Sequence, residues 1–447
     1  MRVGNSPMMA MRFAAEFAKS TRTRLLPPEK LDELRSRRLR RLLAHAYEQV
    51  PYYHDLFRSI GAVPSVFEDP AKLKTFPALS RETLIQDQDR LRAVGVPAVY
   101  TRRTTGTTGV PLKIPWTEEY LAVFAALHIR QITVAGVMPW LRTASLWPPE
   151  RTWRRTSYPG EPERPITISE ELPFGRRLMR LLPNFFPIWS DILDPVHDAE
   201  ALARIRPDFV ISTPSRLVRV GRAAEAKGVV LRPKAVLLAN ETVTVRAKAL
   251  LADLFDCPVL IGYGAAEFGP LGMECSYGRG IHLHEDYLVF EVMKDGERVG
   301  PGEEGELVLT TLHNRAMPLI RCRNGDILRL ADSGVCECGS WLTRVAQIRG
   351  RAADGLVTSE GGRITPVDAA ETVEESIGVR DYQLVQLRVD EFLLKVRRGT
   401  TIGRDSERRL EGALSRSIGV EVHLEVAENP DEDFVAKHRP VVCNVQA

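Results

Sequence analysis

Apolar residues recur at helical spacing along the first part of the chain. Leucines at this spacing run through residues 28–61, and Pro51 interrupts them, which predicts a boundary between two helices. Ser80 is a candidate helix cap, and residues 118–134 have the pattern of an amphipathic helix. The basic run at residues 35–41 lies within the first helical pattern, so we expect it to form a solvated helix face.

Helices and short apolar strands alternate from residue 198 onward. The expected helices cover residues 199–206, 215–227 and 245–255, and the expected strands cover residues 209–211, 235–239 and 259–261. This alternation is typical of a parallel sheet that helices cover on both faces. Ligands of such sheets bind beyond the carboxyl ends of the strands, where the sequence places loops at residues 212–214, 240–242 and 262–267.

The pattern changes to antiparallel β from about residue 282. Gly/Pro turns separate expected strands at residues 288–292, 305–311 and 319–321, and residues 349–355 have the composition of a linker. A small α+β unit follows, with helices at residues 366–377 and 404–418 and strands at residues 382–387, 392–396 and 421–426. We therefore predict an α/β protein with a large N-terminal domain, residues 1–350, and a small α+β domain, residues 351–447. Parallel sheets covered by helices and a β-rich subdomain make up the large domain.

Composition limits the classes of partner and the compartment. The chain has 447 residues, of which 44% are hydrophobic and 27% are charged, as in soluble globular proteins. Its 61 Lys and Arg nearly balance 58 Asp and Glu, which argues against a nucleic-acid or membrane partner. Charges interrupt residues 1–19, and no apolar run approaches the about 20 residues of a membrane span. We expect a cytoplasmic protein; its oligomeric state stays open, a homodimer included.

Six consecutive Thr and Gly residues form a candidate phosphate-binding loop. They are Thr104, Thr105, Gly106, Thr107, Thr108 and Gly109, between two strand-like segments. Glycine lets the backbone approach an anion closely, and amide and hydroxyl groups supply hydrogen-bond donors, so the loop can bind a triphosphate. It is neither a Walker A motif nor a Rossmann fingerprint, and an ordinary surface turn can have the same composition.

Together with three later motifs, this loop makes the chain resemble the adenylate-forming superfamily. The motifs are Tyr263-Gly264-Ala265-Ala266-Glu267, the segment at residues 318–326, and Gly350-Arg351 with Asp354. The branch that it resembles contains the phenylacetate-coenzyme A ligases and related capsule-biosynthesis proteins. The resemblance implies ATP-dependent activation of a carboxylic acid, with aryl acids favoured, as an acyl-adenylate. Transfer to a thiol, that of coenzyme A, follows, and the C-terminal domain is a mobile lid.

The resemblance also implies roles for individual residues. The Thr104–Gly109 loop would hold the β- and γ-phosphates of ATP, and Glu267 would hold Mg²⁺. The remaining nucleotide contacts would come from Tyr263 and Gly264 at the adenine, Glu241 near the adenine or acid pocket, Asp326 at the ribose hydroxyls and Arg351 at the ribose and phosphates. Asp354 would be the hinge of the lid, and Lys437 would neutralise the charge that develops between carboxylate and α-phosphate.

Three positions depart from the family pattern. Ala266 replaces a Thr, Val110 replaces a Lys, and Ala436 replaces a Gly. A hydrogen bond to a charged group contributes about 1.5–3 kcal/mol, so the loss of one slows a step without abolishing it. Two alternatives therefore stay open: an enzyme of this fold that transfers to an amine or a carrier protein, and a nucleotide-binding zinc protein that no longer turns over.

A second candidate site consists of cysteine and histidine. Cys336 and Cys338 lie in a Cys-x-Cys-Gly turn, and Cys275 with His282 can complete a set of three thiolates and one imidazole. This is the ligand chemistry of structural Zn²⁺. His284 is the competing nitrogen ligand, and three free thiols in a β-rich subdomain remain the alternative to a metal.

Overall fold

The computed structural model describes residues 7–103, 112–138, 140–147, 185–189, 194–379, 381–397, 399–429 and 439–445. The Thr104–Gly109 loop, Val110, Ala436 and Lys437 lie outside the described residues. Their assigned roles stay predictions. No helix among the described residues is long and apolar enough to cross a membrane.

The N-terminal part is helical, as its apolar spacing predicts. Its helices are α1 (Pro7–Thr23), α2 (Pro28–Gln49), α3 (Pro51–Ser59), α4 (Arg81–Gln86) and α5 (Glu118–Val134), with 3-10 turns η1 (Pro64–Phe67) and η2 (Lys72–Thr75). Pro51 begins α3, because a proline at the first helical position lacks only an N–H that would stay unpaired there. Ser80 caps α4 by accepting a hydrogen bond from the Thr83 amide. Both boundary predictions are confirmed.

Two predictions about helix faces are wrong. In α5 the residues from Tyr120 to Leu127 are all buried, so its first half is not amphipathic; α1 and the strand β8 (Gly269–Glu274) cover it. The basic run in α2 is not wholly solvated either. Arg38 is buried over the Tyr287 ring and donates to the Asp286 carbonyl, because α2 packs against that segment.

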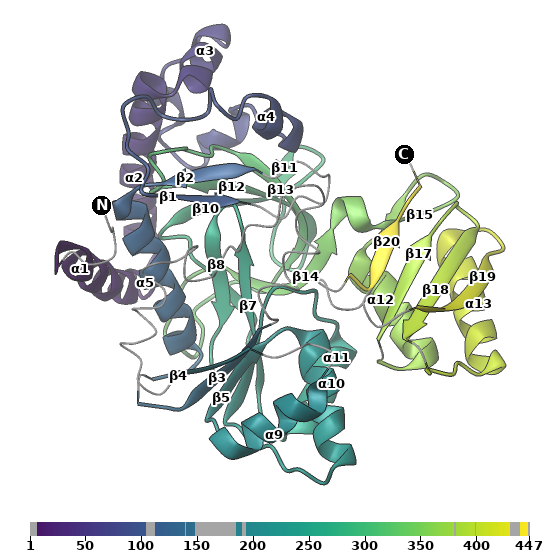
Figure 1. Cartoon of the computed structure of the whole chain (residues 1–447). Helices are drawn as coiled ribbons and strands as arrows, with labels where there is room; N and C mark the ends of the chain where they lie inside the picture. Colours follow the sequence, from purple (N-terminus) through teal and green to yellow (C-terminus); the bar gives the residue numbers. More distant parts are fainter. Residues whose placement is uncertain are drawn as a thin grey trace, which may run out of the picture.

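One sheet of 12 strands forms the centre of the large part (Figure 1). Its order is β11-β10-β12-β13-β14-β9-β8-β7-β6-β5-β3-β4. The parallel strands are β3 (Thr143–Trp147), β4 (Phe185–Trp189), β5 (Phe209–Ser212), β6 (Ala235–Leu238) and β7 (Val259–Ala265), with helices α9 (Pro195–Ile205), α10 (Pro214–Ala226) and α11 (Val245–Phe255). The prediction of parallel strands alternating with helices is confirmed. Beyond β7 the same sheet continues with antiparallel strands, beginning with β8.

The antiparallel strands of this sheet differ from the predicted ones at functionally important positions. They are β8, β9 (Ile281–Leu283), β10 (Leu288–Lys294), β11 (Glu297–Arg298), β12 (Glu304–Thr311), β13 (Cys322–Leu330) and β14 (Arg344–Arg351). The segment at residues 319–321 is not a strand, and β13 begins directly after it, where Arg321 has a φ of 49°. The expected loop at residues 262–267 and the expected linker at residues 349–355 also begin as strand, in β7 and β14.

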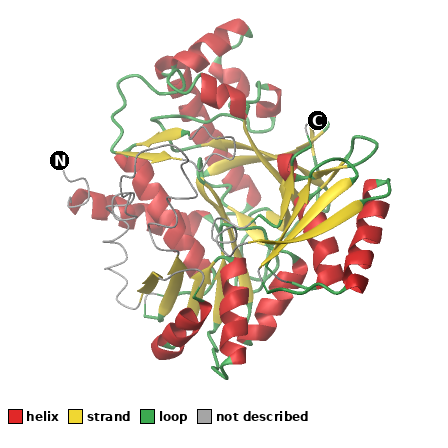
Figure 2. Cartoon of the chain, turned by 45° about the vertical axis from the view of Figure 1, so that its right-hand side comes forward, coloured by secondary structure: helices red, strands yellow, loops and turns green. Residues whose placement is uncertain are grey.

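The C-terminal part has a separate sheet and a separate core (Figure 2). Strands β17 (Tyr382–Gln386), β18 (Glu391–Arg397), β19 (His423–Asn429) and β20 (Val441–Cys443) form this sheet in the order β19-β18-β17-β20, with helices α12 (Pro366–Ile377) and α13 (Arg404–Ile418). The 3-10 turn η3 (Ala352–Asp354) and the short strands β15 (Leu356–Val357) and β16 (Arg363–Ile364) precede it. A second strip of sheet, β1 (Tyr100–Arg103) paired with β2 (Lys113–Trp116), flanks the predicted phosphate loop.

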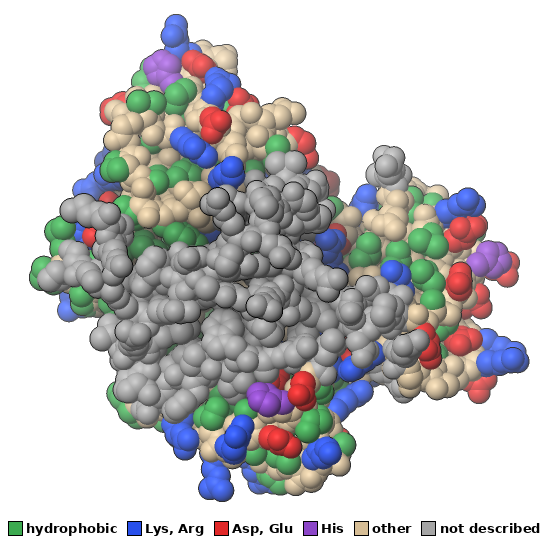
Figure 3. All heavy atoms as spheres, in the orientation of Figure 1, with side chains coloured by type: hydrophobic (Ala, Val, Ile, Leu, Met, Phe, Trp, Pro, Cys, Tyr) green, Lys and Arg blue, Asp and Glu red, His purple; other side chains and the backbone are tan. Residues whose placement is uncertain are grey.

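Charges of both signs are distributed over the N-terminal helices and the C-terminal unit on the face in Figure 3. This mixture agrees with the nearly balanced composition.

Candidate nucleotide site and metal cluster

Tyr263 of β7 lies against Asp326 of β13. The Tyr263 Oη donates a hydrogen bond of 2.6 Å to Asp326 Oδ2. Four strand-to-strand steps separate β7 from β13 in the sheet order, and at about 4.8 Å per step a flat sheet would hold them about 19 Å apart. The sheet must therefore curve strongly between these strands. This curvature brings two residues of different motifs into one site.

Two further side chains contact the same carboxylate. Asn324 and Asp326 flank Gly325, which has a φ of +82° in a bulge of β13, and the Asn324 side-chain amide donates to Asp326 Oδ2. Arg351 is the direct partner of Asp326 in the β13–β14 register, with its Nε 3.6 Å from Oδ1. Burial, and then the charge of Asp326, raise the pKa of Tyr263 well above its ordinary value. Tyr263 is therefore a neutral donor.

Glu267 lies in the turn between β7 and β8 and is 8% exposed. Its carboxylate forms an ion pair with Arg81, with Nη1 and Oε1 separated by 3.5 Å. Arg81 begins α4. Two residues earlier, Leu79 forms a β-bridge to Cys322 at the start of β13. This bridge places Arg81 near the start of β13. Sequence reasoning missed Arg81 as a site residue. The only sequence signal for Arg81 is its position directly after the helix cap Ser80.

Glu241 follows β6 and holds the N-terminus of α10. Its Oε2 accepts from the Ser215 amide at 3.1 Å, and its Oε1 accepts from the Ser215 hydroxyl at 3.1 Å. A carboxylate at a helix N-terminus pairs with donors that the helix leaves unpaired. Glu241 thus joins two of the loops predicted at the carboxyl ends of the strands, and no described contact links it to Tyr263 or Asp326.

Gly264 and Gly269 allow the turn after β7 to pack closely. A Cβ on Gly264 would lie 3.1 Å from the Gly269 carbonyl oxygen. Gly269 has a φ of +76°, and a Cβ there would lie 2.7 Å from the Phe124 ring of α5. The glycines let the strand turn approach α5, where Phe124 stacks between Trp116 and His128 with ring centroids 4.6 and 4.4 Å away.

His128 is a second residue that sequence reasoning did not single out. It is exposed, and its ring packs on that of Phe124 with ring centroids 4.4 Å apart. Arg102 lies over the Trp116 and Phe124 rings, 5.6 and 5.7 Å from their centroids. An imidazole and a cation therefore lie on the same aromatic cluster of β2 and α5.

Asp354 ends the short turn η3 that follows β14. Its Oδ1 is 3.4 Å from Nη1 of Arg439, which precedes β20. The residue therefore lies between the large sheet and the C-terminal unit, and its hinge role stays a prediction.

Four candidate metal ligands converge where β8 and β9 meet the turn between β13 and β14. The ligand atoms of Cys275, His282, Cys336 and Cys338 all lie within 4.8 Å of one another. The sulfurs of Cys275 and Cys336 are 3.8 Å apart, and Cys338 Sγ is 3.6 Å from His282 Nε2. Tetrahedral ligands about 2.3 Å from a central Zn²⁺ would be about 3.8 Å apart. The geometry thus fits the predicted ion.

Burial favours the neutral forms of the imidazole and of the thiols in this cluster. Burial lowers the pKa of His282 to about 4, so its imidazole is neutral, as a ligand must be. Burial raises the pKa of Cys275 and Cys338, the latter to about 12. A divalent cation would offset the cost of the buried thiolates. His284, the competing ligand, instead contacts the guanidinium of Arg130 through its Nδ1.

Comparisons with known proteins identify relatives along most of the chain. No family model matches. The phenylacetate-coenzyme A ligase of Thermus thermophilus is 29% identical over 387 residues, covering 83% of this chain and 82% of the relative. The phenylacetate-coenzyme A ligase of Aromatoleum evansii is 25% identical over 425 residues, covering 89% and 91%. The predicted resemblance to phenylacetate-coenzyme A ligases is confirmed.

Solved structures show the same fold. The structure of 2-hydroxyisobutyryl-CoA ligase in the postadenylation state with 2-HIB-AMP has a TM-score of 0.74 at 19% identity, covering 92% of this chain and 88% of that chain. The same ligase in the thioesterification state with 2-HIB-AMP and CoA has a TM-score of 0.65 at 19% identity, covering 91% and 88%. The predicted α/β fold class of adenylate-forming ligases is confirmed.

Proposed function

We propose that this protein, a relative of phenylacetate-coenzyme A ligases, is an ATP-dependent, AMP-forming acid–thiol ligase. The cluster of Tyr263, Asp326 and Arg351 carries the proposal, because it unites an aromatic ring, a carboxylate and a cation from three strands. These are the groups that an adenosine phosphate requires. The ring offers a face for adenine, the carboxylate accepts hydrogen bonds from ribose hydroxyls, and the guanidinium pairs with phosphate.

The first half-reaction forms a mixed anhydride. A carboxylate oxygen of the acid attacks the α-phosphorus of ATP, a new P–O bond forms, and the bond to the β-phosphate oxygen breaks to release pyrophosphate. Negative charge develops on the phosphate oxygens, so cations and donors accelerate the step. Arg351 supplies a cation from β14. The Thr104–Gly109 loop and Lys437 would supply donors and the second cation.

Glu267 is the residue that would hold Mg²⁺. Held there, Mg²⁺ would supply positive charge that offsets the charge developing on the phosphates. In the structure the Glu267 carboxylate is paired with Arg81. Arg81 would turn from Glu267 toward the phosphates when the nucleotide binds.

The second half-reaction transfers the acyl group to coenzyme A. The thiolate attacks the acyl carbon, the thioester C–S bond forms, and AMP leaves with the electrons of the C–O bond. We assign residues 1–350 to the nucleotide and acid sites and residues 351–447 to a lid. Asp354 is its hinge, because a residue between two packed units can absorb the backbone change of a rotation.

We assign an aryl acid as the substrate class. The named activity of the relatives favours it, and the rings of Phe124 and His128 pack together beside Gly269 in the turn after β7. Glu241 would contribute by fixing the loop at the N-terminus of α10. The acid itself is left to experiment.

The thiol and imidazole cluster would hold one structural Zn²⁺. Cys275, His282, Cys336 and Cys338 are four protein ligands, so no coordination position remains for a substrate. The ion would tie β8 and β9 to the turn that carries Cys336. We also propose a cytoplasmic location, in which such thiols stay reduced, and a homodimer as the state to test.

Pyrophosphate release tests the proposal. The wild-type enzyme is assayed with ATP, Mg²⁺ and a panel of aryl and aliphatic acids, beside a Lys437→Ala variant and a control that changes the exposed Lys234. Release that requires an acid, and that falls by orders of magnitude in Lys437→Ala alone, is expected. Thioester formation must then require coenzyme A. Nucleotide binding without release for any acid would overturn the proposal.

A further inference from the structure

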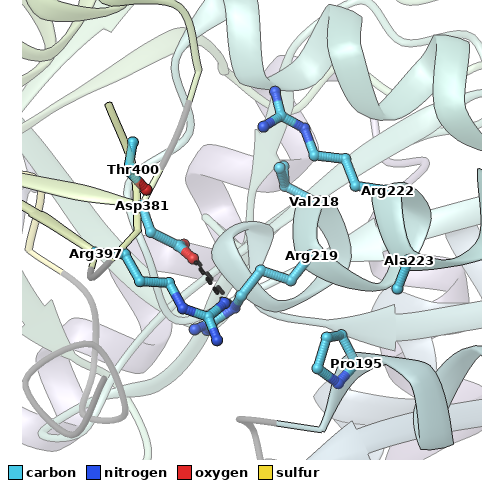
Figure 4. A pocket seen from close by; sticks show the side chains of 8 residues that line it. All are labelled: Pro195, Val218, Arg219, Arg222, Ala223, Asp381, Arg397 and Thr400. Atoms are coloured by element: carbon cyan, nitrogen blue, oxygen red, sulfur yellow. Dashed lines mark ion pairs between the residues drawn. The ribbon is translucent and has the colours of Figure 1, made fainter. Parts of the chain in front are cut away.

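A recess separates helix α10 from the C-terminal unit (Figure 4). Its volume is about 340 Å³, and its lining comes from both sides: Pro195, Val218, Arg219, Arg222 and Ala223 from α9 and α10, and Asp381, Arg397 and Thr400 from the C-terminal unit. None of these residues belongs to the candidate nucleotide site or to the metal cluster. The recess is therefore a separate feature of the boundary between the two units.

The lining of this recess is strongly cationic. Among its described lining residues three arginines face one carboxylate, so their positive charges exceed the negative charge by two. Asp381 is shared: its Oδ1 lies 3.9 Å from Arg219 Nε and its Oδ2 lies 3.5 Å from Arg397 Nη1. Figure 4 shows the Arg219 and Arg397 guanidiniums meeting at this carboxylate from opposite units. One carboxylate does not neutralise two guanidiniums, and Arg222 adds a third.

Arg219 is the decisive residue. Its side chain is 5% exposed, and within the part of the chain that the structure describes none of its three guanidinium nitrogens has a hydrogen-bond partner. A buried charged group without hydrogen bonds is costly, and such groups are rare unless a ligand or ion satisfies them. The neighbouring Arg216 on the same helix shows the ordinary solution, because it is 1% exposed and Asp198 accepts from its Nε at 2.8 Å.

We propose that this recess binds a phosphate group. A phosphate dianion matches the excess of two positive charges, and its oxygens accept paired hydrogen bonds from the planar guanidinium fork. The Thr400 side chain, which also lines the recess, adds a hydroxyl donor. Because Arg219 comes from α10 and Arg397 from β18, the bound anion bridges the two units and stabilises the orientation in which they meet.

Isothermal titration calorimetry on the full-length protein tests this site with inorganic phosphate and pyrophosphate. Arg219→Gln is expected to weaken phosphate binding about ten- to a hundred-fold, because it removes a hydrogen bond between charged groups. Arg397→Gln weakens it as well, and Asp381→Asn strengthens it by removing the competing carboxylate. Arg232→Gln is the matched control, since Arg232 is an exposed residue of the same part of the chain. Arg351→Gln, in the candidate nucleotide site, tests the other location, because a loss of phosphate affinity confined to this variant overturns the proposal.

Two further ligands identify the source of the phosphate. If coenzyme A binds more tightly than dephospho-coenzyme A, and Arg219→Gln abolishes the difference, the site takes a 3′-phosphate of the thiol substrate. If free phosphate or pyrophosphate binds and the two coenzymes do not differ, the site takes a free anion. Absence of binding to the wild-type protein overturns the proposal. So does an unchanged affinity in both Arg219→Gln and Arg397→Gln, each shown by circular dichroism to be folded.

Discussion

The Thr244 hydroxyl donates a hydrogen bond of 2.6 Å to Glu374 Oε2, and this contact joins the large part of the chain to the C-terminal unit. Thr244 is the N-cap of α11, where its hydroxyl also accepts from the Ala247 amide. Glu374 lies on α12 and is 6% exposed. Burial is the main reason that its pKa rises to about 7, and nearby Glu371 adds to the rise.

The raised pKa of Glu374 predicts that the free energy of unfolding falls as the pH rises from about 4.5 to 7. Glu374 binds a proton more tightly in the folded protein than in the unfolded chain, so the folded state holds more protons in that window. The loss is at most about 3 kcal/mol by linkage. Glu374→Gln cannot ionise and is expected to remove most of this slope in urea unfolding between pH 4.5 and 8.

The matched control for this prediction is Glu375→Gln on the same helix. Glu375 is 63% exposed and pairs with Arg246, so its loss should leave the slope unchanged. If Glu374→Gln kept the wild-type slope, Glu374 would not be the titrating group.

Asp326→Asn is expected to raise the KM for ATP. The amide keeps one acceptor oxygen but loses the charge that strengthens hydrogen bonds from ribose, a change of about 1.5–3 kcal/mol, or roughly ten- to a hundred-fold. Pyrophosphate release at varied ATP concentrations measures the effect. Asp256→Asn, at an exposed carboxylate on the same part of the chain, should change nothing, and an equal effect of both substitutions would refute a specific ribose contact.

Ala266→Thr is expected to accelerate adenylation. Ala266 directly precedes Glu267 in the turn after β7, where the family pattern has a hydroxyl. A restored hydrogen bond to the charged phosphate gives about ten-fold in kcat, the lower end of the range for such bonds. Ala266→Val matches the shape of threonine without its hydroxyl. If Ala266→Thr and Ala266→Val gave equal rates, the change in rate would come from side-chain shape and not from the hydroxyl.

Metal analysis is expected to find one zinc per chain, lost in Cys336→Ser. Cys336 is 3% exposed, so its loss leaves the other buried ligands without a shared cation. Thermal unfolding should then begin at a lower temperature, because metal binding contributes folding free energy. Cys257→Ser, at a half-buried thiol outside the cluster, is the control. A wild-type protein that contains no zinc and shows no thiolate–cobalt absorption on reconstitution would refute the site.

Local pattern alone determined much of this protein. The predicted bounds of the helices at residues 118–134, 245–255, 366–377 and 404–418 are those of the structure. These bounds depend on apolar spacing, caps and prolines, which act within one element. The order of the four motifs likewise required no structure, and it led to the family that the relatives support.

Local pattern failed where packing decides. Residues 262–267 are expected to form a loop beyond the carboxyl end of a strand. In the structure residues 262–265 continue β7, because they pair with β8. The interior of α5 is another case, because coverage by α1 and β8 together cannot be read from a single helix.

The amino-acid sequence by itself predicted which residues carry chemistry and determined the bounds of several helices. Only the tertiary structure decided which of them meet. The curved sheet brings Tyr263 to Asp326, the β8–β9 edge brings His282 to Cys338, and the boundary between the units brings Arg219 to Asp381. The physical reason is that periodicity reports the neighbours of a residue within its own helix or strand. Sheet curvature and the contact between the units depend on the packing of the whole chain.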